Sequence, residues 1–410
     1  MNYKRLGDYI EPCNEKNKDD SIKLLQGISN RKYFQKAKTN TIGVDLSKYR
    51  IVRTGQFAFN RATTRNSDRI SIALRFKEDC IVSPSYRIFK SKDENILNSE
   101  YVMMWFKRPE FDRYARFRSH GSAHEFFDYD EMCDVRLPIP SIEKQQQMVA
   151  EYNTVTNRIN LNNQLNQKLE KTAQALYKHW FVDFEFPNTE NKPYKSSGGL
   201  MVYNDELEKD IPVGWSVERL GNLTSLLKRG ISPKYTLGDG VIVINQKCIR
   251  NNSVNLALSR IHNSSLKSIS DEKIIKKLDV LVNSTGTGTL GRVGIIKTVD
   301  YVLTVDTHVT IIRANNQINK YYLSSFLSSN EDLIVELGHG STGQTELSRD
   351  SLGEMILPIP SISTQTHFEL ILDKLQYSII SYEKSLPKLQ ELQSLLLAKM
   401  TQQETEAAIV

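Results

Sequence analysis

Arginine residues gather in two stretches of the first 120 residues, and their type and spacing suit nucleic-acid binding. In the polar stretch NRATTRNSDR at 60–69, every fourth position is an arginine: Arg61, Arg65 and Arg69. The run WFKRPEFDRYARFRSHG at 105–121 interleaves five aromatic residues with basic ones, among them Arg113, Arg116 and Arg118. Arginine can donate two hydrogen bonds to one guanine edge, and aromatic side chains stack on bases. Both stretches are candidate DNA contacts, although the second also fits an amphipathic helix with solvated arginines.

The second half of the chain offers a smaller set of candidates for the same work. Glutamine prefers adenine, and a glycine-rich hairpin lets the backbone approach a phosphate group. Such a stretch surrounds Gly286 and has an arginine at its edge. The candidate DNA contacts in this half are Gln246, Lys247, Arg292, His339 and Gln344.

Two patterns resemble catalytic motifs, but neither has the right context. Glycines at 286, 288 and 291 spell G-x-G-x-x-G, yet the sequence RVGIIK that follows predicts a strand. A dinucleotide site needs a helix N-terminus at that point. Asp183, Glu190 and Lys192 resemble the acidic pattern of some metal-dependent nucleases, but they fall in a proline-rich stretch rather than on adjacent strands.

Other catalytic signatures are missing from the sequence. It contains no N/D-P-P-F/Y tetrapeptide for amino-methylation and no Walker A lysine loop. His120 and His339 have no serine, cysteine or carboxylate partner at a recognisable spacing. The four cysteines form no CxxC pair, which predicts neither a zinc site nor a disulfide framework. We therefore expect a reader or scaffold with no catalytic residue and no metal.

Length and composition indicate a two-domain globular protein. The chain has 410 residues, 39% hydrophobic and 25% charged, which is too long for one ordinary core. Its formal net charge of +6 is compatible with a polyanionic partner but does not require one. The sequence has neither an apolar run of 18 residues nor a recognisable signal region, so we expect a cytoplasmic protein without membrane contact.

The chain is an internal duplication. The hexapeptide LPIPSI occurs at 137–142 and again at 357–362, so its two copies lie 220 positions apart. Arg-Leu-Gly stands at 5–7 and at 219–221, and His-Gly-Ser at 120–122 and 339–341. Two like halves, each a globular module followed by a long helix, can form a pseudo-twofold molecule.

Each module is predicted to mix strands with one helix. In the first module we expect strands at 56–60, 70–76 and 80–89 and a helix at 99–106, stopped by Pro109. In the second we expect strands at 241–245, 280–283, 293–297 and 309–313 and a helix around 320–328. The predicted fold class is therefore mixed α/β, of the α+β type.

A long helix with a coiled-coil seam is predicted after each module. Apolar residues recur with alternating spacings of three and four from Met148 to Trp180 and from Phe368 to Met400. We expect the two seams to pair as an antiparallel coiled coil, a rod of about 60 Å for 40 helical residues. The alternative is that each helix covers only its own module. The residues expected to pair the helices are Ile159, Leu169, Leu176, Ile379, Leu389 and Leu396.

The same patterns give the expected boundaries. We predict a kink or break near Pro387, because proline inside a straight helix costs roughly 3 kcal/mol. Residues 186–210 read as a linker, rich in proline, serine and glycine. The expected segments are a first module at 1–140, a long helix at 141–185, the linker, a second module at 211–360 and a second long helix at 361–402.

The order of these pieces resembles the specificity subunit of a Type I restriction-modification system. The resemblance covers essentially the whole chain. It is carried by HGSTGQTELSRDSLGEMILPIPSISTQ at 339–365, KLEKTAQALYKHWFVDFEFP at 168–187, PYKSSGGLMVYNDELEKDIPVGW at 193–215 and DVLVNSTGTGTLGRVG at 279–294. The first module departs from the pattern, with HGSAHEFFDYDEM at 120–132 in place of the STGQ-like loop.

The resemblance implies two target-recognition domains that each read half of a split DNA sequence, with helices that fix the unread spacer. It implies no chemistry of the subunit's own. The implied partners are double-stranded DNA, two methyltransferase subunits that bring S-adenosylmethionine, and restriction subunits that use ATP and Mg²⁺. Two rival hypotheses stay open: a stand-alone pseudo-dimeric DNA-binding regulator, and a self-contained restriction or modification enzyme.

Overall fold

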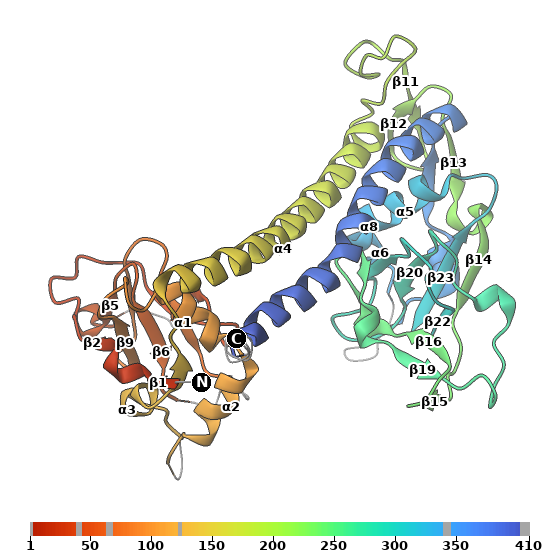
Figure 1. Ribbon diagram of the computed structural model, residues 1–410. Helices are drawn as coiled ribbons and strands as arrows, with labels where there is room; N and C mark the ends of the chain where they lie inside the picture. The colour runs from red at the N-terminus through yellow and green to blue at the C-terminus, as the bar shows by residue number, and fades with distance from the viewer. Residues whose placement is uncertain (1–2, 38–42, 63–68, 122–124, 339–345, 402–410) are drawn as a thin grey trace. The chain divides into compact units, whose positions relative to one another are not determined.

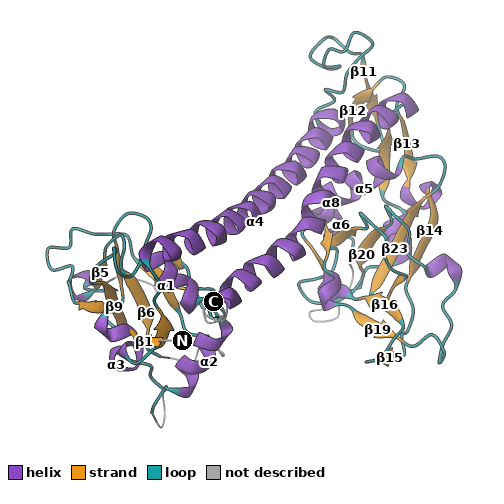
Figure 2. Ribbon diagram, viewed as in Figure 1, coloured by secondary structure: helices purple, strands orange, loops and turns teal. Residues whose placement is uncertain are grey.

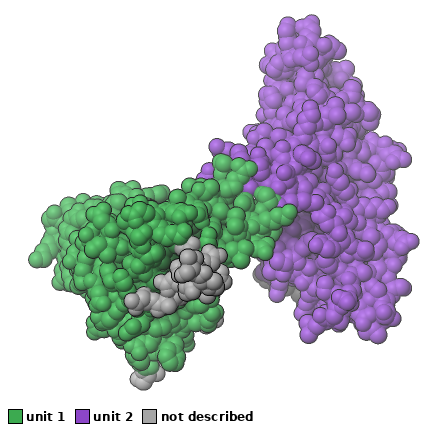
Figure 3. Space-filling model, in the orientation of Figure 1, with its two compact units in different colours: residues 1–161, 385–410 green, residues 162–384 purple. Residues whose placement is uncertain are grey.

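A computed structural model describes residues 3–37, 43–62, 69–121, 125–338 and 346–401. The chain divides into two compact units (Figure 3): unit 1 comprises residues 1–161 and 385–410, and unit 2 comprises residues 162–384. Each unit holds one module of strands and short helices together with parts of two long helices, α4 (Ile142–Tyr177) and α8 (Ile362–Lys399) (Figures 1 and 2). The mixed helix and strand content confirms the predicted fold class.

The module of unit 1 is built on a four-stranded antiparallel sheet. Its strand order is β2 (Ile10–Cys13), β9 (Tyr86–Ser91), β6 (Phe57–Asn60) and β7 (Ile72–Leu74). Two strand pairs flank this sheet: β3 (Gln26–Ile28) with β4 (Phe34–Lys36), and β5 (Arg50–Val52) with β8 (Cys80–Val82). Three short helices complete the module: α1 (Ser99–Phe106), α2 (Pro109–Phe117) and α3 (Tyr129–Cys133).

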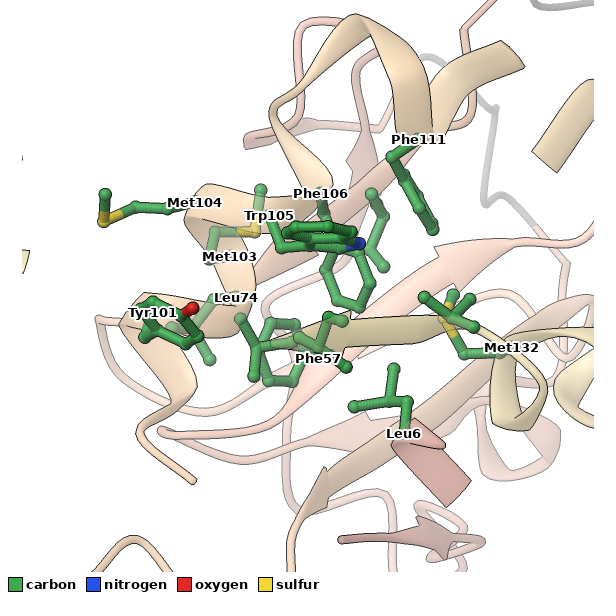
Figure 4. Packing of buried hydrophobic residues seen from close by; sticks show 14 of the residues in the cluster. Leu6, Phe57, Leu74, Tyr101, Met103, Met104, Trp105, Phe106, Phe111 and Met132 are labelled. Atoms are coloured by element: carbon green, nitrogen blue, oxygen red, sulfur yellow. The ribbon is translucent and has the colours of Figure 1, made fainter. Parts of the chain in front are cut away.

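Aromatic side chains from the sheet and from α1 fill the core of this module (Figure 4). Phe57 stacks on Phe89 with ring centroids 4.8 Å apart, and Phe106 packs edge-on against both. The side chain of Asn98 caps α1 by accepting a hydrogen bond from Tyr101 N, which gives this apolar helix a defined start. Pro109 ends the predicted helix as expected and occupies the first turn of α2, where its missing N–H costs nothing.

The module of unit 2 contains two four-stranded sheets. One has the antiparallel order β14 (Thr224–Arg229), β23 (Val309–Ala314), β20 (Val280–Asn283) and β21 (Val293–Ile295). The other has the order β15 (Tyr235–Thr236), β19 (Arg260–His262), β16 (Val241–Ile244) and β22 (Leu303–Val305), with β16 and β22 parallel. A further pair joins β17 (Ile249–Arg250) to β18 (Ser253–Val254), and the helices are α5 (Lys320–Ser329), α6 (Glu331–Glu336) and α7 (Arg349–Gly353).

Both modules close by pairing their first strand with the strand that leads into a long helix. In unit 1, β1 (Tyr3–Arg5) pairs antiparallel with β10 (Arg136–Pro138), and in unit 2, β13 (Ser216–Arg219) pairs with β24 (Ile356–Ile359). The repeated LPIPSI therefore spans a closing strand, a turn and a helix start. Its proline-rich form fits this role, because residues before proline favour extended backbone.

A buried glutamine fixes the start of each long helix to its module, and we call this pair the glutamine anchors. The Oε1 atom of Gln145 accepts a hydrogen bond from Asn98 N at 2.9 Å, while its Nε2 atom donates to Pro140 O at 2.9 Å. Gln365 does the same with Asn319 N at 2.9 Å and Pro360 O at 2.8 Å. Both glutamines are fully enclosed, with 0% and 1% exposure.

The predicted seams of α4 and α8 are covered by protein. Of the residues expected to pair the helices, Ile379 is buried, and Ile159, Leu169, Leu176, Leu389 and Leu396 are half-buried. In unit 1, Gln393 Nε2 on α8 donates to Thr156 Oγ1 on α4 at 2.8 Å. In unit 2, the ring centroid of Tyr177, near the end of α4, lies 6.4 Å from that of Phe368, near the start of α8. The late part of each helix thus meets the early part of the other, which is antiparallel pairing.

The helix α8 continues through Pro387, so a break at this residue is wrong, while a kink there stays a prediction. Proline removes only the single bond that its N–H would donate to the carbonyl of Glu383. Helical turns on both sides propagate at one bond per residue and can carry that loss. The end of α4 also differs from the predicted plain helix, because residues Lys178–Val182 form a π-helical turn that buries Trp180 and Phe181.

The segment expected to be a linker is more ordered than its composition suggests. Strands β11 (Met201–Asn204) and β12 (Lys209–Pro212) pair as a hairpin. Before the hairpin, Phe186 stacks on Tyr194 with ring centroids 4.6 Å apart and lies 5.4 Å from Trp215. Aromatic packing therefore holds down a stretch whose prolines and glycines alone predicted irregular chain.

Candidate nucleic-acid interface

Arg61, the first arginine of the polar stretch, is held by its own module. Its guanidinium lies 3.1 Å from Asp128 and 4.5 Å from the centre of the Phe126 ring. Arg87 binds the same carboxylate at 2.6 Å. Partial burial would raise the pKa of Asp128, but the hydrogen bonds from Arg87, Tyr129 N and Arg61 outweigh it and keep that pKa below its ordinary value. Arg61 therefore holds the carboxylate of Asp128, which caps the start of α3. A contact between Arg61 and DNA would have to compete with this ion pair.

Of the other two arginines of that stretch, only Arg69 is among the described residues. Arg65 lies outside the described residues. Arg69 is exposed and lines a cavity that also contains Lys107 and Arg108 from the aromatic-rich run. Cations from the two sequence clusters are therefore brought to one place.

The arginines of the aromatic-rich run lie on or next to α2, and this segment is amphipathic. Phe111 is buried in the core, whereas Arg113 is 71% exposed and pairs with Glu110 at 3.2 Å. Arg116 pairs with Glu125 at 3.0 Å, and Arg118 with Asp134 at 3.1 Å. The local packing therefore matches the alternative of an amphipathic helix, in which the aromatic residues enter the core and the arginines face solvent. The exposed pairs are weak enough to exchange for phosphate contacts.

In unit 2 the glycine-rich stretch joins β20 to β21 as a hairpin turn, so RVGIIK does not begin a helix and the dinucleotide pattern has no structural basis. Gly286 has a φ of +105°, and a Cβ atom there would stand 2.7 Å from Gln246 Oε1. Arg292 donates to Gly288 O at 2.7 Å across the turn. Only glycine permits this close approach of the hairpin to Gln246.

Gln246 lies beside this hairpin and is half-buried. Its side-chain oxygen is buried against the hairpin and has no hydrogen-bond partner among the described residues. Contact with adenine through this amide stays a prediction. Lys247 is exposed beside it, while His339 and Gln344 lie outside the described residues.

Sequence reasoning missed an exposed polar pair next to this hairpin. Thr285 Oγ1 lies 2.7 Å from His308 Nδ1, at an exposed position. Both groups can donate and accept hydrogen bonds, as base edges require. No local signal in the sequence marks this pair, because the two residues stand 23 positions apart and meet only when β20 and β23 align. Among the described residues of this module, the candidate DNA contacts are therefore Thr285 and His308 together with the predicted Gln246, Lys247 and Arg292.

The remaining polar groups give no sign of a metal or thiol site in the described part of the chain. Glu190 and Lys192 form an exposed ion pair at 2.9 Å, and no cluster of three histidine, cysteine or acidic residues there is placed to hold a metal ion. Burial raises the pKa of Cys80 to about 11, so its thiol stays protonated at neutral pH. Within the same residues, no helix is both long enough and apolar enough to cross a membrane.

Comparison with known proteins places the chain among specificity subunits. The family model for the Type I restriction modification DNA specificity domain matches twice, at residues 9–171 and 212–392. The specificity subunit of the Type I restriction enzyme MjaIX from Methanocaldococcus jannaschii is 26% identical over 307 residues, which is 74% of this chain and 68% of that protein. The specificity subunit of the Type I restriction enzyme HindI from Haemophilus influenzae is 30% identical over 110 residues, 26% of this chain and 24% of that protein.

A solved structure has the same fold. The crystal structure of a Type I restriction-modification system S subunit from M. genitalium aligns with a TM-score of 0.59 and 14% identity, covering 97% of this chain and 95% of that one. This likeness concerns the fold alone. Together with the duplicated closing strands and glutamine anchors, the two matches of the family model lead to one conclusion: the chain belongs to the family of Type I restriction-modification DNA specificity domains and carries two of them.

Proposed function

We propose that this chain is the DNA sequence-specificity subunit of a Type I restriction-modification complex and that each module reads one half of a bipartite target. The observation that carries the proposal is the duplication. The family domain occurs twice, and both copies use a closing strand pair and a glutamine anchor of the same design. Two like readers in one chain suit a target with two separated half-sites.

The two long helices are assigned the role of a spacer. Both α4 and α8 run from one compact unit into the other without a break, since the units divide them after Leu161 and before Ser385. A continuous helix transmits a fixed rise of about 1.5 Å per residue. The number of helical residues between the modules is therefore the quantity that would set the distance between the half-sites.

We assign the chemistry to partner subunits and none to this chain. Two methyltransferase subunits would bring S-adenosylmethionine, and restriction subunits would use ATP and Mg²⁺ to translocate and cut unmethylated DNA. The names of both relatives, specificity subunits of restriction enzymes, support such an assembly. On this chain, the groups available to DNA are the partly paired arginines of α2 in unit 1 and the exposed residues beside the glycine hairpin in unit 2.

The test is to map methylated adenines in cells that express this chain with its methyltransferase. We expect a split motif that disappears when the chain is deleted. Exchanging residues 1–140 for the recognition module of another specificity subunit should change one half-site, and exchanging 211–360 should change the other. A change in both halves after a single exchange would contradict modular reading. Binding of the isolated chain to its site with full affinity, and no methylation, would favour the stand-alone regulator.

Spacing is tested separately. Inserting seven residues into α4 after 161 and seven into α8 before 385 preserves the heptad register and should lengthen the unread spacer while leaving both half-sites unchanged. The matched control inserts seven residues into α4 alone, which shifts the pairing and should abolish methylation. An unread spacer of unchanged length with the double insertion would disprove the proposal that the long helices set the distance between the half-sites.

A further inference from the structure

Unit 1 contains a basic cavity of about 720 Å³, and the candidate DNA contact Arg69 is one of its lining residues. It lies between the loop at Asn30–Lys32, the turn from α1 to α2, Tyr152 on α4 and the last turns of α8. Two of its lining residues are acidic, Glu110 and Asp112. Five are basic: Arg31, Lys32, Arg69, Lys107 and Arg108. The lining side chains thus carry a net charge of +3.

Both acidic residues are already engaged. Asp112 lies 2.7 Å from the ammonium group of Lys32, and both side chains are largely buried. Glu110 contacts Arg113 at 3.2 Å and Arg108 at 3.5 Å. The excess positive charge of the cavity is therefore not neutralised by its own carboxylates.

Three of the five cations make no ion pair in the described part of the chain, although the carboxylate of Glu100 is near enough to Lys107 to act against the lowering of its pKa. The ammonium group of Lys107 lies 4.8 Å from the centre of the Tyr152 ring and makes no ion pair there. Arg31 and Arg69 are exposed at the rim, likewise without an ion pair among the described residues. Burial lowers the pKa of Lys107, which means that an anion in the cavity would favour its charged form.

Arg108 is the fixed element of the cavity. Arg108 is only 7% exposed, and its guanidinium carbon lies 4.4 Å from the centre of the Trp105 ring. The Nε atom is buried and has no hydrogen-bond partner in the described chain. A guanidinium held on an aromatic face keeps a defined orientation, which lowers the entropy lost when an anion binds.

Unit 2 has the counterpart of this cavity, and its chemistry is different. The corresponding space, between α5 and the two long helices, measures about 90 Å³. It is lined by four serines, by the amides of Gln174, Asn251, Asn252 and Gln376, by the apolar or aromatic residues Ala173, Tyr177, Ile295, Leu372 and Ile379, and by Glu170 and Lys297. Its only lysine, Lys297, is paired with Glu170 at 2.8 Å and with Glu383 at 3.5 Å. The shared fold can therefore be built without a basic cavity, so the fold does not explain the cations of unit 1.

We propose that the basic cavity of unit 1 binds a phosphate group, either one of a DNA backbone or one of a free nucleotide. Arginine and lysine side chains together provide forked and single donors, which suit a multiply charged tetrahedral oxyanion better than a lone carboxylate. The volume falls in the range of pockets that hold small ligands. The site goes beyond base reading and spacing, because neither needs a cavity that only one module possesses.

The test uses the full chain and three ligands: inorganic pyrophosphate, ATP and duplex DNA. The main variant is Arg31→Gln/Arg69→Gln/Lys107→Gln. Its matched control, Lys168→Gln/Lys171→Gln/Lys195→Gln, removes three exposed charges outside the cavity. We expect wild type and control to bind pyrophosphate in calorimetry at low salt, and the main variant to bind it at least about tenfold more weakly, because charge-assisted hydrogen bonds are lost. Arg31→Gln/Arg69→Gln, which changes only exposed residues, covers the case in which the triple variant does not fold.

The two sources of phosphate give different results. If the cavity holds DNA backbone, the main variant also binds duplexes of any sequence more weakly, and the slope of log affinity against log salt falls by about 1 to 2. If it holds a nucleotide, ATP binding falls while duplex binding matches the control. The proposal is overturned if wild type does not bind pyrophosphate, or if the cavity variants bind it as the control does. Either result leaves the methylation experiment unaffected, so the two proposals fail separately.

Discussion

The two modules fasten their long helices with the same hydrogen bonds, whereas the cavities of the two modules are lined by different side chains. In both, a buried glutamine accepts from the backbone N–H of an asparagine that caps a helix, Asn98 or Asn319. In unit 1 the cavity is lined by five basic residues, and in unit 2 it is lined by serines, amides and apolar side chains with a single paired lysine. The difference teaches that duplication retained the groups that satisfy buried backbone atoms and left the cavity lining free to change.

The glutamine anchors give the largest expected effect. In Gln145→Leu, the buried backbone groups at Asn98 and Pro140 lose their partners, so we expect the free energy of unfolding to fall by about 2 to 3 kcal/mol. Urea unfolding measures the loss. Hydrogen exchange then localises it, because protection should fall in α1 peptides but not in α5 peptides, with the reverse for Gln365→Leu.

The matched control is Gln146→Leu, since Gln146 is exposed next to the anchor. We expect it to change the unfolding free energy by less than about 0.5 kcal/mol. Equal losses of unfolding free energy in Gln145→Leu and Gln146→Leu would contradict a role of the anchor in stability. Lower hydrogen-exchange protection in both modules of either anchor variant would show that the anchors do not act locally.

An effect of intermediate size is expected from the proline that only the second of the two long helices contains. Pro387 lies inside α8, and the residue 220 positions earlier, in α4, is Gln167. Pro387→Ala restores one backbone hydrogen bond, so we expect stability in urea to rise by about 1 to 3 kcal/mol, against a few tenths for Gln167→Ala. A loss of stability would show instead that α8 is shaped around its proline and that the packing of its seam depends on it.

The smallest expected effect is a pH dependence of stability that arises in unit 1 and has no equivalent at the matching position of unit 2. Asp128 caps α3 in unit 1, while Ser348, 220 positions later, caps α7 in unit 2. The folded-state pKa of Asp128 is lowered, so its contribution to stability is fully present above the unfolded-state pKa and disappears as pH falls through the folded-state pKa. We expect Asp128→Ser to lower the urea midpoint at neutral pH and to match wild type near pH 2. A difference that persisted in acid would assign the effect to packing rather than to charge.

Local elements of this fold are readable from the sequence, because their causes are local. The helix at Ser99–Phe106 is predicted to the residue: an asparagine caps its start and Pro109 forbids its continuation. The strands at 241–244 and 280–283 follow from β-branched runs that are buried on folding. The repeat of LPIPSI reveals the duplication without any structure.

What the sequence does not reveal depends on residues that are far apart in the chain. Gln145 meets Asn98 across 47 positions, so nothing near either residue marks the anchor. Arg61 pairs with Asp128 across 67 positions, so nothing near Arg61 in the sequence marks this ion pair. The basic cavity likewise combines cations from separate stretches. Helix propagation around Pro387 is a further case, because a local penalty is outweighed by the length of the flanking helix.

The division of the chain into units also sets the order in which they can be completed during synthesis. Unit 2 is one continuous segment, 162–384, whereas unit 1 needs both 1–161 and 385–410. Met400 and Leu396 pack into the same core as Met148 and Tyr152 of the first unit. The module that leaves the ribosome first must therefore wait, with part of its apolar core uncovered, until the last turns of α8 arrive. Although translated second, unit 2 is the first that can finish folding.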